Sequence, residues 1–196
     1  MTTSNAALDP LAILDRGGAQ FAAVLGRVPD TAWAGPTGCA DWTVRELVAH
    51  VVGGQRLAAI LLHGAERDEG LAALAGDFLG DDPNAAFARE HAACVAAFRE
   101  PGALERTCAH PMGDIPATML LGFRIGDLTL HSWDLAHATG TDETLDPVLV
   151  ETVWANVSPL GDAIAQTGVF GEGPSDTVAD DAPLQQRLID FTGRRP

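Results

Sequence analysis

Two histidines and one aspartate are the side chains of this sequence whose types and spacing best suit chemistry. Asp127 and His131 stand four residues apart, so in a helix they point the same way, one turn from each other. His50 falls on a stripe of leucines in a separate helical pattern, and a histidine that faces a core needs a polar partner. Two imidazoles and a carboxylate can bind a divalent cation between helices. These three residues therefore predict a metal site.

Three protein ligands would leave one coordination position of the metal open. A water or thiol bound at that position loses its proton near neutral pH and becomes a nucleophile, as in catalytic metal sites. We expect zinc, although two histidines and one carboxylate also suit nickel, iron and manganese. The spacing permits a metal-free alternative as well. In that alternative His50 is a hydrogen-bonded core residue, and Asp127 and His131 belong to the solvated face of a helix.

The other reactive side chains are assigned to packing or to the surface. The remaining histidines are expected to be structural or solvent-exposed: His63, His91, His110 and His137. The cysteines are odd in number and lack CxxC spacing, which predicts free thiols and no cysteine-type zinc site: Cys39, Cys94 and Cys108. Trp42 and Trp133 are expected to pack at helix ends, with a place at a pocket mouth as the alternative. Asp134 is expected to accept a hydrogen bond from a histidine or a backbone cap.

Start and stop signals divide the chain into helices. Asp9 and Pro10 open a helix that continues toward Pro29, and Thr43 with Glu46 forms a capping box before a helix over residues 44–62. Further helical patterns cover residues 85–100, 117–139 and 148–166, and a short amphipathic helix over 183–191 is expected to dock on the bundle. Residues 105–116 are too polar for a helix and predict a short hairpin or an extended cover loop.

Length and composition predict a single domain over residues 1–196, and the helical patterns predict that this domain is all-α. A chain of 196 residues with 46% hydrophobic content can fill one core. The formal charge of −15 should repel nucleic-acid phosphates and anionic membrane surfaces, so we expect neither as a partner. The N-terminus lacks the pattern of a secretory signal, and no run approaches the roughly 18 apolar residues of a membrane span. A cytoplasmic protein is therefore expected.

Two segments of the sequence resemble a known protein family. GCADWTVRELVAHVVGG and DLTLHSWDLAHATG resemble the DinB-like proteins of actinobacteria, in particular the N-terminal metal-binding domain of mycothiol-dependent maleylpyruvate isomerase. The final segment, GVFGEGPSDTVADDAPLQQRLIDFTGRRP, is similar to the end of small members of that group. The resemblance implies a DinB-like four-helix bundle with an additional short C-terminal helix, and a homodimer. It also matches the family's metal ligands to His50, Asp127 and His131.

The resemblance further implies thiol-dependent chemistry. A low-molecular-weight thiol such as mycothiol would bind the metal as a thiolate and attack a small electrophile, giving isomerisation or S-transfer. Asp127 replaces the isomerase's glutamate and is one methylene shorter, so it could bind directly, through water, or by orienting a neighbour. The isomerase also has a C-terminal domain that this chain lacks room for, which argues against maleylpyruvate isomerase activity itself. The alternatives are a non-catalytic metal- or ligand-binding module and a metal-free structural bundle.

Overall fold

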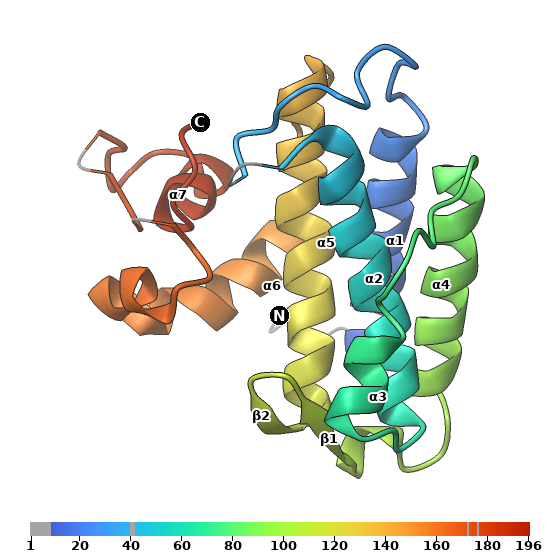
Figure 1. Ribbon diagram of the computed structural model, residues 1–196. Coiled ribbons are helices and arrows are strands. Elements are labelled where there is room, and N and C mark those ends of the chain that lie inside the picture. The colour runs from blue at the N-terminus through green and yellow to red at the C-terminus, as the bar shows by residue number, and fades with distance from the viewer. Residues whose placement is uncertain (1–8, 40–41, 172, 176) are drawn as a thin grey trace, which may run out of the picture.

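Four long helices lie side by side and form the body of the molecule (Figure 1). The computed structural model describes residues 9–39, 42–171, 173–175 and 177–196, so the first eight residues, on which the expectation of no secretory signal rests, lie outside it. The four helices are α1 (Pro10–Leu25), α2 (Val44–Leu62), α4 (Pro83–Phe98) and α5 (Ala117–Thr139). Helix α2 packs against α4 and α5, and α1 packs against α5 and α4. The predicted mainly α-helical fold is confirmed.

Short local signals set the ends of these helices. The hydroxyl of Thr43 accepts a hydrogen bond from the backbone of Glu46, whose carboxylate returns the bond, and this capping box begins α2. Asp9 and Asp82 cap α1 and α4, and each is followed by a proline that suits the first helical position. Gly140 ends α5 in the left-handed conformation, with φ of 63°. The two helices that carry the candidate ligands therefore have fixed ends.

Smaller elements lie between the long helices. Strands β1 (Thr107–His110) and β2 (Gly113–Pro116) pair antiparallel, so the hairpin alternative for residues 105–116 is confirmed. Helix α3 (Arg67–Ala72) and the 3-10 turn η1 (Ala103–Glu105) were not predicted. Both are too short to show a periodic apolar pattern. In the described part of the chain, no helix is long and apolar enough to cross a membrane.

The C-terminal part departs from the predicted boundaries. Helix α6 (Pro147–Val157) ends before the expected residue 166, and the chain continues as a 3-10 segment, η2 (Ser158–Thr167). Pro159 lacks a backbone donor, and Gly161 takes a non-helical conformation, so an α-helix cannot continue there. The predicted short amphipathic helix exists as α7 (Leu184–Phe191), and it packs mainly on α6 beside the bundle (Figure 1).

Candidate functional site

The structure brings His50, Asp127 and His131 together between α2 and α5. His50 Nε2 lies 3.6 Å from Asp127 Oδ2. The two imidazole rings meet edge to face, with their centroids 5.0 Å apart. One donor atom from each of the three side chains lies within 4.8 Å of the other two. Helical spacing thus placed the two α5 residues correctly on one face, and the helix packing supplies the third. Metal binding by this group stays a prediction.

The two histidines of the site differ in how far their side chains are exposed to solvent. The side chain of His50 is 41% exposed, so the prediction that this histidine faces the core is wrong, whereas the side chain of His131 is 9% exposed. The ring of Trp42 lies 4.7 Å from the His50 ring and 6.2 Å from the His131 ring, so Trp42 lines the group. Trp42 is half-buried and packs against the hydrophobic core, as predicted, and its ring also borders the two histidines. Trp133 is buried and stacks on His137, as expected of a packing residue.

Arg124 keeps Asp127 ionised. Its Nη2 lies 2.9 Å from Asp127 Oδ2. Burial raises the pKa of the Asp127 carboxyl, but Arg124 and then the two histidines lower it by more, so the net pKa lies well below its ordinary value. Gly54 makes room for this guanidinium, because a Cβ at that position would lie 1.7 Å from Arg124 Nη1. Nε and Nη1 of Arg124 are buried and find no hydrogen-bond partner among the described residues.

His131 is oriented by a carboxylate on the next turn of α5. Its Nδ1 lies 2.8 Å from Asp134 Oδ2, which fulfils the expectation that Asp134 accepts a hydrogen bond from a histidine. Because an ionised carboxylate can only accept, Nδ1 donates, and a neutral ring then carries its lone pair on Nε2. Burial raises the pKa of Asp134, but its bonds from His131 and Arg194 lower that pKa by more. His131 is thus prepared to ligate through Nε2.

Cys39 was predicted to be an ordinary thiol, yet it lies beside the site. Its sulfur and donor atoms of His131 and Asp134 all lie within 4.8 Å of one another. Burial, followed by the charge of Asp134, raises the pKa of this half-buried thiol to about 11. Cys39 belongs to the loop before α2. The residues around it show no spacing typical of metal ligands, so the sequence could not have predicted its place beside His131 and Asp134.

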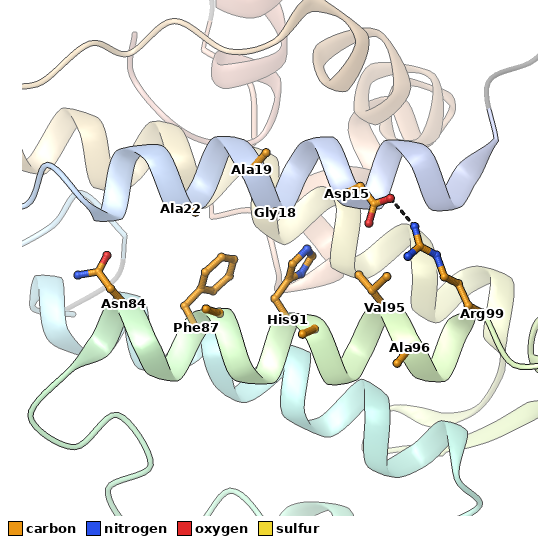
Figure 2. Close-up of a pocket in the computed structure, with 12 residues that line it drawn as sticks. Asp15, Gly18, Ala19, Ala22, Asn84, Phe87, His91, Val95, Ala96 and Arg99 are labelled. Carbon is orange, nitrogen blue, oxygen red and sulfur yellow. Dashed lines mark hydrogen bonds and ion pairs between the residues drawn. The ribbon is translucent and has the colours of Figure 1, made fainter.

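Burial, and then the charge of Arg124, lowers the pKa of His110, so this buried histidine lies near the site. The other three histidines contact groups away from it. His63 pairs with Glu100, and His137 pairs with Glu143. His91 stacks on Phe87 in a groove of about 710 Å³ between α1 and α4, lined mainly by small and apolar residues (Figure 2). The groove crosses the face of the bundle formed by α1 and α4, whereas the candidate ligands come from α2 and α5. This groove therefore does not contain the candidate metal ligands.

Comparison with known proteins identifies a family whose matching domain includes the residues of the candidate site. The model of the mycothiol maleylpyruvate isomerase N-terminal domain matches residues 14–136, which include every candidate ligand. The chain belongs to this family. Two curated relatives, the uncharacterized proteins Rv0738 and MT0763 of Mycobacterium tuberculosis strains H37Rv and CDC 1551, are each 36% identical over 199 residues. Each of these alignments covers 95% of this chain and 98% of the relative.

Solved structures of the mycothiol-dependent maleylpyruvate isomerase share the fold of this family member. One is 21% identical with a TM-score of 0.60, and the match covers 75% of this chain and 67% of the enzyme. A histidine-to-alanine mutant of the enzyme is 19% identical with the same TM-score, and covers 85% and 72%. The family match ends at residue 136, so Arg194 lies outside it.

Proposed function

We propose that this protein binds one divalent metal ion, with zinc expected, through His50, Asp127 and His131. The observation that carries the proposal is the convergence of two imidazoles and a carboxylate within 4.8 Å. Ligand atoms about 2.0–2.2 Å from a tetrahedral zinc ion lie roughly 3.3–3.6 Å from one another. The 3.6 Å between His50 Nε2 and Asp127 Oδ2 fits that spacing. This fit supports direct ligation by Asp127 despite its shorter side chain.

The role proposed for the metal is activation of a low-molecular-weight thiol of the mycothiol type. A bound zinc ion would supply a Lewis acid that lowers the pKa of a coordinated thiol. Membership of the mycothiol maleylpyruvate isomerase N-terminal domain family supports this choice of thiol. The thiolate would then attack a small electrophilic substrate, in an isomerisation or an S-transfer.

The protein's own residues would divide the remaining work. Arg124 holds Asp127 in the ionised form that a metal ligand needs. Asp134 directs the lone pair of His131 to Nε2. His50 is the exposed member of the group, so we propose that the thiol and the electrophile approach on its side, beside Trp42. Trp42 would exclude water from the face of the His50 ring.

Elemental analysis of the tag-free protein tests metal binding. We expect about one equivalent of metal in the wild type, and its loss in both His50→Ala and His131→Ala. His137→Ala is the matched control, because His137 lies on the same helix and pairs with Glu143 outside the group. Circular dichroism checks that each variant remains folded. A wild type that takes up no metal after reconstitution with zinc, nickel, iron or manganese would favour the metal-free structural bundle.

Cobalt-substituted protein tests thiol binding. Added mycothiol should produce a sulfur-to-cobalt charge-transfer band in the wild type, and no such band in His131→Ala. Turnover is then measured with a panel of small electrophiles. A band without turnover of any electrophile would favour the alternative of a non-catalytic ligand-binding module. Size-exclusion chromatography with light scattering tests the expected homodimer separately.

A further inference from the structure

The C-terminal segment reaches the candidate metal site through Arg194. Its Nε lies 2.7 Å from Asp134 Oδ1, and its Nη2 lies 2.7 Å from Asp134 Oδ2. Asp134 Oδ2 also accepts the hydrogen bond of His131 Nδ1. The side chains of Arg194 and Asp134 are only 13% and 2% exposed. A buried two-point bond thus connects Arg194 to Asp134, 60 residues away in sequence, and Asp134 in turn binds the candidate ligand His131.

Local structure fixes the position of Arg194. The amide of Gly193 donates to the carbonyl of Asp190, and the amide of Arg194 donates to that of Ile189. These two bonds form a Schellman motif after α7, in which Gly193 takes a left-handed φ of 79°. A Cβ on Gly193 would lie 2.3 Å from the carbonyl oxygen of Phe170, so the position also requires glycine for space. Arg194 therefore leaves a rigid turn and not a free tail.

We infer that Arg194 is a positioning residue of the metal centre, acting through Asp134 on His131. The inference rests on the proposed metal site. A carboxylate can rotate about its terminal bond, and a single hydrogen bond from His131 would leave that rotation free. The planar guanidinium binds both carboxylate oxygens and stops the rotation. The ring of His131 is then fixed by a carboxylate that is itself fixed. Removal of such outer partners typically lowers metal affinity about 10–100-fold.

A purely structural role is the competing explanation. In that case Arg194 only fastens the C-terminal segment to α5, and its loss would lower thermal stability without changing the metal centre. The two roles differ in a measurable way. A positioning residue affects the affinity and the coordination geometry of the metal, whereas a structural fastener does not.

Zinc competition against a chromophoric chelator separates these roles in the full-length protein. Arg194→Gln should weaken zinc binding about 10–100-fold relative to the wild type, with partial recovery in Arg194→Lys. Arg195→Gln is the matched control, because Arg195 is exposed and contacts Asp190 instead of Asp134. Ser175→Ala is a second control that removes the hydrogen bond donated by the Ser175 hydroxyl to Asp190 and loosens the segment without touching Asp134. Both controls should bind zinc as the wild type does.

Cobalt spectra of the same proteins give the second readout. The d–d bands of Arg194→Gln should differ from the wild type in position or intensity, and those of Ser175→Ala should not. Wild-type affinity and spectrum in Arg194→Gln would overturn the inference while leaving the proposed function intact. Absence of metal from the wild type would instead overturn both the proposed function and the inference about Arg194. If Arg194→Gln does not fold, Arg194→Lys carries the test, because lysine cannot make the two-point bond.

Discussion

Two histidines of this molecule lie between packed helices, and their surroundings differ. The Nδ1 of His131 on α5 binds the carboxylate of Asp134, and donor atoms of His50 and Asp127 lie within 4.8 Å of a His131 ring nitrogen. His91 on α4 stacks on Phe87 and lies 3.4 Å from the amide oxygen of Gln55, in a groove whose ends are marked by Asn84 and the Asp15–Arg99 pair (Figure 2). Burial lowers the pKa of His91. A helix-facing histidine becomes a ligand candidate through its acidic neighbours, and neither burial nor the size of the adjacent hollow is sufficient.

The largest expected contrast is between removing each of these rings. His131→Ala should reduce bound metal from about one equivalent to background, because it deletes the ligand that Asp134 orients. His91→Ala should keep the full equivalent. Elemental analysis and chelator competition on the two variants measure the contrast. Equal loss in both variants would mean that metal uptake reports the general integrity of the bundle.

A second contrast compares two helix glycines, Gly54, which faces the guanidinium of Arg124, and Gly18, which faces the ring of His91. A Cβ at Gly54 would lie 1.7 Å from Arg124 Nη1, and one at Gly18 would lie 1.9 Å from His91 Nε2. Each alanine forces a side-chain end to move, and gains about 1 kcal/mol in helix propensity, so the two melting temperatures should change by similar small amounts. Only Gly54→Ala displaces the partner of Asp127. Zinc affinity should therefore fall several-fold in Gly54→Ala and stay unchanged in Gly18→Ala.

The smallest expected effect concerns the thiol beside the site. The raised pKa of Cys39, about 11, means that the neutral thiol dominates below that pH. In metal-free protein its alkylation by iodoacetamide should be slow at pH 7.5 and rise up to about tenfold per pH unit toward pH 10. Peptide mass spectrometry follows Cys39 separately from the buried Cys94, whose pKa is raised to about 12. Fast alkylation of Cys39 at pH 7.5 would show that a neighbouring cation stabilises its thiolate.

The sequence was informative where structure is local. The capping box at Thr43 and the start signal at Asp9 and Pro10 predicted where two helices begin, and helical spacing put Asp127 and His131 on one face. The predicted fifth helix ran too far, because the apolar period persists across Pro159 and Gly161 while the backbone does not. That residues 1–196 form one domain stays a prediction.

Non-local contacts limited the prediction of the site. Arg194 reaches Asp134 from a turn after α7, and no spacing rule connects two residues so far apart in the chain. Cys39 reaches the same carboxylate from a loop. His50 was singled out by its place on an apolar stripe and was grouped with Asp127 and His131 by residue type, and the family resemblance then matched the same three residues. Ligands on one helix can thus be predicted from their period, whereas the groups that orient them required the fold.

X-ray absorption at the zinc edge of the reconstituted wild type tests whether His50, Asp127 and His131 ligate the metal. We expect two imidazole nitrogens and a carboxylate oxygen at about 2.0–2.2 Å, with a sulfur at about 2.3 Å only after mycothiol is added. A sulfur shell before any thiol is added, and absent in Cys39→Ala, would contradict this ligand set. Such a result would place Cys39 among the ligands in a site different from the one proposed.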